Sequence, residues 1–129
     1  MKIERLLDVA KGVALSGSGV GGRNSRSFRL GAILFDKQHR IITAGVNSYK
    51  THPKLVPFTK YPFIHAEQAC ILSHGLDNCE GLSIAVVRVK RDGSIGNAEP
   101  CETCKTIMKV VGIIKCYHST EDSYKEERL

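Results

Sequence analysis

The chain has 129 residues, of which 42% are hydrophobic and 25% are charged, and its formal net charge is +6 at pH 7. This length and composition suit a globular protein with a single core, so we predict one domain over residues 1–129. The sequence contains neither a recognisable signal peptide nor an apolar run of membrane-spanning length, which predicts a cytoplasmic protein, and its positive charge favours a nucleotide or nucleic acid as partner.

The hydrophobic pattern and the turn residues predict seven main elements, in the order helix, strand, strand, helix, strand, helix, strand. They are an amphipathic helix over 3–15, a hairpin of "FRLGAILFD" and "RIITAGVNS", a helix in "HAEQACILSHG", a strand in "LSIAVVRVK" with a turn and short hairpin after it, a helix in "CETCKTIMKVV", and a strand in "IIKCYHS". The charged tail "TEDSYKEERL" is expected to be a solvated helix or a frayed end. The order predicts an α/β fold in which helices cover a sheet.

Two segments between these elements differ from ordinary loops. The first, "GSGVGGRNSRS", contains a formal G-x-G-x-x-G, but it follows a helix, whereas a dinucleotide-binding motif follows a strand. We therefore interpret it as a surface loop. The second, "YKTHPKLVPFTKYPF", holds three prolines, three lysines and four aromatic residues. It is long for a compact domain, which favours a functional role.

The motif "EPCETC" places Cys101 and Cys104 one turn apart at the start of a predicted helix. Five cysteines in a chain without an export signal make a disulfide framework the least favoured interpretation, which leaves a redox pair or half of a metal site. His65 opens the preceding helix, and two helix starts can converge on one ion. Three ligands of mixed nitrogen and sulfur type leave the fourth position of a tetrahedral zinc ion to water, as in catalytic sites. Glu67 would then stand near that water.

The combination of "HAE" with "PCETC" is the signature of zinc nucleobase deaminases. Over most of its length the sequence resembles the cytidine/deoxycytidylate deaminase superfamily, in the His-Ala-Glu branch that includes deoxycytidylate, tRNA adenosine and polynucleotide cytosine deaminases. The strand end "AGVNS" is part of the resemblance, because Gly45 and Asn47 match the G-x-N of the family. The resemblance implies a cytidine deaminase-like three-layer fold, with a mixed sheet of about five strands flanked by helices, and assembly into a homo-oligomer.

The resemblance also assigns roles to individual residues. It implies one Zn²⁺ per chain, in agreement with the three-ligand pattern described above. It also implies that the acidic residue of "HAE" is a proton shuttle. Substrate would be positioned by the asparagine of the strand end and by a backbone group of the second helix. The residues concerned are His65, Cys101 and Cys104 as ligands, Glu67 as the shuttle, and Asn47 and the Ala66 backbone as substrate contacts.

The departures from the family pattern bear on the substrate. Histidine at position 65, where small free-cytidine deaminases usually carry cysteine, disfavours that subgroup. Thr103 stands where the tRNA enzymes commonly carry methionine, and the link before "HAE" is long and basic. We predict deamination of a cytosine nucleotide such as deoxycytidine monophosphate. The alternatives are a base in single-stranded nucleic acid, cytosine before tRNA adenosine, and a non-catalytic zinc-stabilised binding protein.

The two unusual segments supply candidates for substrate contacts. Basic side chains within them would meet a phosphate, and aromatic side chains would pack in the core or stack on a base. The candidates are Arg23, Arg26, Lys54 and Lys60 for phosphate, and Tyr49, Phe58, Tyr61 and Phe63 for packing or stacking.

Overall fold

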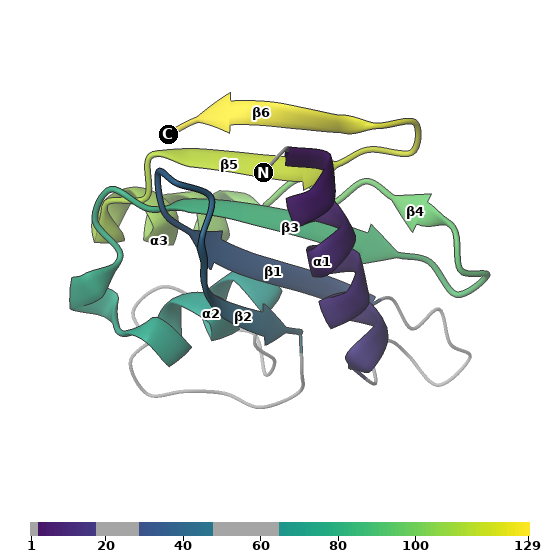
Figure 1. The fold of residues 1–129 in the computed structure, drawn as a ribbon, viewed down its shortest axis with the longest axis horizontal. Helices are drawn as coiled ribbons and strands as arrows, with labels where there is room; N and C mark the ends of the chain where they lie inside the picture. The colour runs from purple at the N-terminus through teal and green to yellow at the C-terminus, as the bar shows by residue number, and fades with distance from the viewer. Residues whose placement is uncertain (1–2, 18–28, 48–64) are drawn as a thin grey trace.

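A computed structural model describes residues 3–17, 29–47 and 65–129 of the chain (Figure 1). All the phosphate and stacking candidates named above therefore lie outside the described residues. The elements are helices α1 (Ile3–Ser16), α2 (Ala66–His74) and α3 (Glu102–Val111), a 3₁₀ turn (Leu76–Asn78), and strands β1 (Arg29–Phe35), β2 (Ile41–Val46), β3 (Ser83–Val89), β4 (Ile95–Gly96), β5 (Lys115–Ser119) and β6 (Tyr124–Arg128).

The six strands form one mixed sheet in which the order β2-β1-β3-β5-β6 is continuous and β4 pairs with β3. The pairs β1–β2, β1–β3, β3–β4 and β5–β6 are antiparallel, while β3 and β5 run parallel. Helix α3 connects the parallel pair, as a crossover must. The predicted hairpin of β1 and β2 and the predicted order of helices are confirmed.

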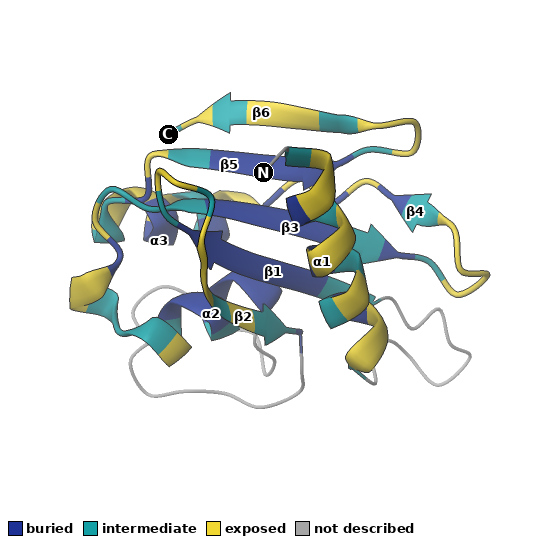
Figure 2. Ribbon diagram, in the orientation of Figure 1, coloured by how far each residue is buried: buried dark blue, intermediate teal, exposed yellow. Residues whose placement is uncertain are grey.

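Helices cover both faces of the sheet, which gives the three layers (Figure 1). Alternate residues of the central strands point to opposite faces, so Ile33 packs with the core beneath α1, whereas Ala32 and Leu34 pack with the core beneath α2 and α3. The strands β1, β3 and β5 are largely buried (Figure 2). Cys70 and Cys116 are buried in the core beneath α2 and α3.

Two glycines allow helices to lie close against the sheet. A Cβ on Gly31 would stand 2.3 Å from the carbonyl oxygen of Ala10 in α1. A Cβ on Gly45 would stand 2.5 Å from the backbone nitrogen of Cys70 and 2.9 Å from the carbonyl oxygen of Ala66, both in α2. The glycine of the G-x-N strand end therefore sets the distance between β2 and the beginning of α2.

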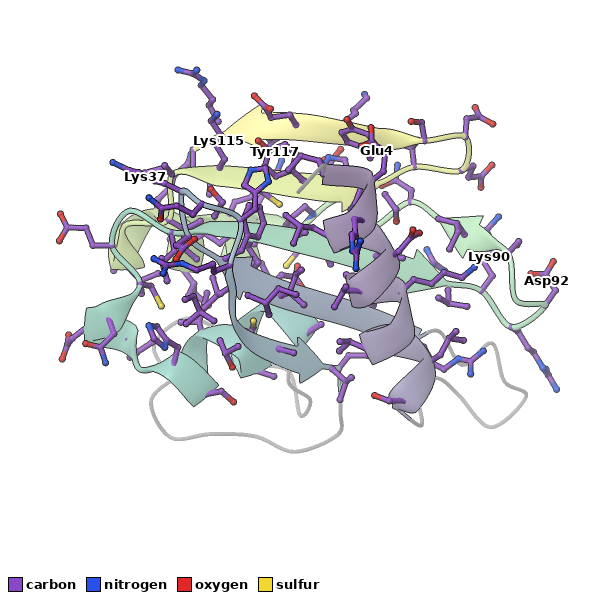
Figure 3. All side chains as sticks on the ribbon, in the orientation of Figure 1. Glu4, Lys37, Lys90, Asp92, Lys115 and Tyr117 are labelled. Atoms are coloured by element: carbon purple, nitrogen blue, oxygen red, sulfur yellow. The ribbon has the colours of Figure 1, made fainter. Side chains whose placement is uncertain are left out.

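The prediction for the charged tail was wrong. Residues 124–128 form strand β6, which pairs with β5 along its whole length at the edge of the sheet. The turn before it is closed by hydrogen bonds between Thr120 and Ser123. The Tyr124 ring lies tilted beside that of Tyr117, with ring centroids 6.5 Å apart. Its hydroxyl donates to a carboxylate oxygen of Glu4 in α1, which lies on the same side of the sheet as Tyr117 (Figure 3). Pairing and these contacts stabilise a strand that has no apolar pattern of its own.

The β3–β4 hairpin carries the "RDG" turn at one end of the sheet. Asp92 lies at its tip and Lys90 at its base (Figure 3), where the Lys90 Nζ is 2.9 Å from a carboxylate oxygen of Glu121. The hairpin was predicted, although β4 is only two residues long. Among the described residues, no helix is long and apolar enough to cross a membrane.

Candidate active site

The two predicted motifs each open a helix. His65 is the N-cap of α2 and Cys101 is the N-cap of α3, both with extended backbone geometry. The two helix starts lie on the same face of the sheet and meet, which brings His65 beside Cys101 and Cys104. The structure therefore brings the two motifs together, as predicted.

The three side chains are arranged as ligands of one ion. The His65 Nδ1 is 3.7 Å from the Cys101 Sγ and 3.1 Å from the Cys104 Sγ, and all three donor atoms lie within 4.8 Å of one another. In a tetrahedral zinc site with bonds of about 2.3 Å to sulfur and about 2.0 Å to nitrogen, neighbouring donor atoms are roughly 3.6 Å apart. The separations fit a zinc ion, and two sulfurs with one imidazole are a donor set that zinc favours.

The local electrostatics favour a thiolate at the exposed position. Hydrogen bonding from the Cys104 side chain and from the His65 ring lowers the pKa of the Cys101 thiol to about 3. The Cys104 backbone N–H also donates to the Cys101 Sγ over 3.5 Å, as an N-cap requires. The pKa of Cys104 is raised instead, because the two sulfurs share one proton and Cys104 is buried. A metal ion would displace that proton, since the ligand form of cysteine is the thiolate.

Glu67 points into the same site from the first turn of α2. Its side chain is only 3% exposed, and burial raises the pKa of the carboxyl group above its ordinary value. Glu67 and His65 both line one cavity of about 530 Å³, although residues two apart on a helix point in different directions. They share the cavity because it lies off the end of the helix. A buried carboxyl group with a raised pKa is suited to taking up and returning a proton.

Asn47 lines the cavity from the end of β2. Its Oδ1 accepts a hydrogen bond of 2.9 Å from the Leu30 backbone N–H, which orients the amide so that its NH₂ group is the part that can donate to a ligand. Ala66 is fully buried in the core, so a substrate contact from this residue would come from its backbone.

Several cavity residues were not found from the sequence. Leu30, Arg88, Asn97, Ala98, Glu99 and Glu102 also line the cavity. Arg88 follows four hydrophobic residues of β3, Ile84 to Val87, and it pairs with Gly96 of β4. The Cδ of Arg88 is 3.2 Å from the place where a Cβ on Gly96 would be, so the glycine leaves room for the arginine stem. A single arginine among hydrophobic residues of a strand was the signal in the sequence that could have identified Arg88 as a cavity residue.

The family model described as "Cytidine and deoxycytidylate deaminase zinc-binding region" matches residues 2–120. Among solved structures, the cytidine deaminase from Burkholderia pseudomallei is similar with a TM-score of 0.66 and 18% identity, covering 99% of this chain and 93% of that one. The cytidine deaminase from Mycobacterium leprae has a TM-score of 0.60 and 20% identity, with 98% and 93% covered.

A dCMP deaminase from the cyanophage S-TIM5, in apo form, has a TM-score of 0.57 and 19% identity, with 93% of this chain and 86% of that one covered. No curated protein matches the sequence. At these identities the solved structures confirm the predicted three-layer fold.

Proposed function

Because the chain belongs to the cytidine and deoxycytidylate deaminase zinc-binding family, we propose that it deaminates a cytosine nucleotide, with deoxycytidine monophosphate as the leading substrate. The chain is a zinc-dependent hydrolytic deaminase. Water replaces the amino group at C4 of the base, so that the C4–N bond breaks, a C4–O bond forms, and the products are the uracil nucleotide and ammonia.

We assign the zinc ion to His65, Cys101 and Cys104. When bound, zinc lowers the pKa of a coordinated water from about 15.7 to about 7. Glu67 is the group that moves protons: its carboxylate accepts one from the attacking water, passes it to N3 of the ring, and later delivers a proton to the departing amine. Its burial supports this role, because a carboxyl group that is easily protonated can both accept and return a proton at neutral pH.

The position of Arg88 supports a phosphate-bearing substrate. It is the one lysine or arginine among the described residues that line the cavity, and it shares that cavity with Glu67 and Asn47. A guanidinium group pairs with phosphate through two parallel hydrogen bonds. A cavity of about 530 Å³ lies in the range of small-molecule sites. Arg88 at one part of this cavity and Glu67 at another would hold the two ends of a mononucleotide.

A comparison of two substrates tests this proposal. Replacement Arg88→Gln should lower kcat/KM for deoxycytidine monophosphate by about 10- to 150-fold, because a hydrogen bond to a charged group contributes about 1.5–3 kcal/mol. It should leave kcat/KM for deoxycytidine almost unchanged. Arg91→Gln is the matched control, because Arg91 is exposed in the turn of the same hairpin. Equal losses on both substrates would contradict a phosphate-binding role for Arg88.

The same deamination assay can be run on the alternative substrates. A polynucleotide deaminase would convert cytosine in a single-stranded oligonucleotide, with a slope of log K against log salt of about −0.7 for each phosphate contacted. An adenosine-specific enzyme would convert adenine in a tRNA anticodon stem-loop. A zinc-stabilised binding protein would release ammonia from none of these substrates. Turnover of an oligonucleotide with steep salt dependence, and none of the monophosphate, would replace our proposal with the polynucleotide one.

A further inference from the structure

The side chain of Gln68 lies between two of the assigned ligands. Gln68 is the third residue of α2 and is 1% exposed. Its Oε1 accepts a hydrogen bond of 3.0 Å from the backbone N–H of His65, and its Nε2 is 3.7 Å from the Sγ of Cys104. One amide group thus contacts the backbone of the histidine and the sulfur of the buried cysteine.

The orientation of this amide follows from its first partner. A backbone N–H can only donate a hydrogen bond, so the Gln68 oxygen must face His65 and the NH₂ group must face Cys104. The sulfur can therefore only accept from Gln68. The Cys101 sulfur accepts from the backbone N–H of Cys104 in the same way. Besides the His65 ring, each of the two sulfurs has an N–H donor among the described residues, and the donor to the buried sulfur is a side chain that can be replaced.

We propose that Gln68 is a positioning residue of the zinc centre, which holds the Cys104 thiolate in place through an N–H···S hydrogen bond and weakens its electron donation to the metal. The proposal rests on the ligand set assigned above. Two thiolates and one neutral imidazole offset the whole charge of Zn²⁺, so a donor to one sulfur leaves the ion more electrophilic. Hydrogen-bond partners of metal ligands orient them and tune the metal in this manner.

The capping contact gives the same side chain a second effect. A glutamine at the third helical position that accepts from the N-cap backbone is half of a capping box, and it fixes the direction in which the chain enters the helix. Because the N-cap residue is His65, the direction of the imidazole is fixed with it. The experiment must therefore separate loss of the N–H···S bond from loss of the cap.

Two substitutions make this separation. Gln68→Glu is nearly isosteric and keeps an oxygen for the His65 N–H, but it brings no N–H donor to Cys104. Gln68→Met removes both contacts at similar length. Gln38→Met is the matched control, because Gln38 is an exposed glutamine in the turn between β1 and β2. Circular dichroism and thermal unfolding establish that each variant is folded before its metal site is compared.

The readouts are zinc affinity, measured by competition with a chromophoric chelator, and the absorption spectrum of the cobalt(II)-substituted protein. We expect both Gln68 variants to bind zinc about 10- to 100-fold more weakly than the wild type, because the loss of ligand positioning outweighs the stronger donation of the released thiolate. Their sulfur-to-cobalt charge-transfer band should move to longer wavelength, because a thiolate that loses a hydrogen bond gives up its electrons more easily. The Gln38 variant should match the wild type in both measurements.

A folded Gln68→Glu protein with wild-type zinc affinity, or with an unshifted cobalt band, would overturn the proposal and leave Gln68 as a helix cap. Failure of the ligand assignment is seen separately: wild-type protein without zinc, or full zinc retention by both Cys101→Ser and Cys104→Ser, contradicts the proposed site itself.

Discussion

Replacing Gly45 with alanine should displace the catalytic end of α2. The new Cβ would lie 2.5 Å from the Cys70 nitrogen and 2.9 Å from the Ala66 carbonyl oxygen. The first of these separations is about 1 Å short of ordinary van der Waals contact. Both neighbours are backbone atoms, so no side-chain rotation can relieve the overlap, and α2 must move away from β2 by about that amount.

This displacement has a stability part and an activity part. Overpacking of this kind costs about 1–3 kcal/mol, which should lower the Tm by roughly 4 °C for each kcal/mol in a chain of this size. Because His65 and Glu67 begin the displaced helix, activity should fall further than stability does. A misplacement of about 1 Å at a catalytic group can cost roughly 100-fold in rate.

Two other glycines are the controls. Gly31→Ala produces a similar overlap with α1, 2.3 Å from the Ala10 oxygen, on the face opposite the site. It should destabilise the protein comparably and leave kcat/KM near the wild-type value below the Tm. Gly12 of α1 has no neighbour within 4 Å of a Cβ, so Gly12→Ala should raise stability by about 1 kcal/mol. Thermal unfolding and ammonia release are measured for all three. If Gly45→Ala retains wild-type kcat/KM, or its kcat/KM falls no further than that of Gly31→Ala, then the close packing of α2 against β2 does not position the site.

The other predictions concern the chemistry of the site. Glu67→Gln, which keeps the shape of a buried side chain, should retain zinc and fold but lose about 10²- to 10⁴-fold in kcat, since general acid–base help is removed; a steady-state rate within tenfold of the wild type would contradict the shuttle role. Cys101→Ser and Cys104→Ser should each lose zinc, as metal analysis of the purified proteins would reveal, and the Cys104 variant should also be less stable because its side chain is buried. Lowering the pH should weaken zinc binding, because protons compete for the cysteine and histidine ligands, and chelator competition across a pH series measures this; affinity that rises on acidification would refute thiolate ligation.

Local patterns were sufficient to predict most of the fold. The motif-bearing helices begin at His65 and Cys101, where the ligand residues cap them, and both end at glycines, so their signals are contained in short segments. Strand β6 was missed because its residues are charged and its stability comes from the neighbouring β5. The Lys105 Nζ, 3.3 Å from a Glu127 oxygen, adds an ion pair that only the folded chain brings together.

The candidate site divides in the same way. His65, Glu67, Cys101 and Cys104 were predicted because their chemistry is expressed in two short motifs. Gln68 carried a local signal, since a glutamine three residues after a helix N-cap is typical of a capping box, but its contact with Cys104 depends on the meeting of two helices. Arg88 carried only the signal of its charge, because the cavity that it lines is assembled from five separate parts of the chain. Substrate contacts depend on such assembly and are therefore the part of a site that sequence reasoning predicts least well.

The distance along the chain between the ligands bears on the unfolded state. His65 is separated from Cys101 by 36 positions and from Cys104 by 39. A covalent cross-link over such a span would reduce the conformational entropy of the unfolded chain by the equivalent of about 4 kcal/mol. A metal bound to these three residues would be a reversible cross-link that closes the segment containing α2, β3 and β4. Loss of the metal would therefore free a third of the molecule to open, and the same ion that supports catalysis would decide how readily the chain is degraded.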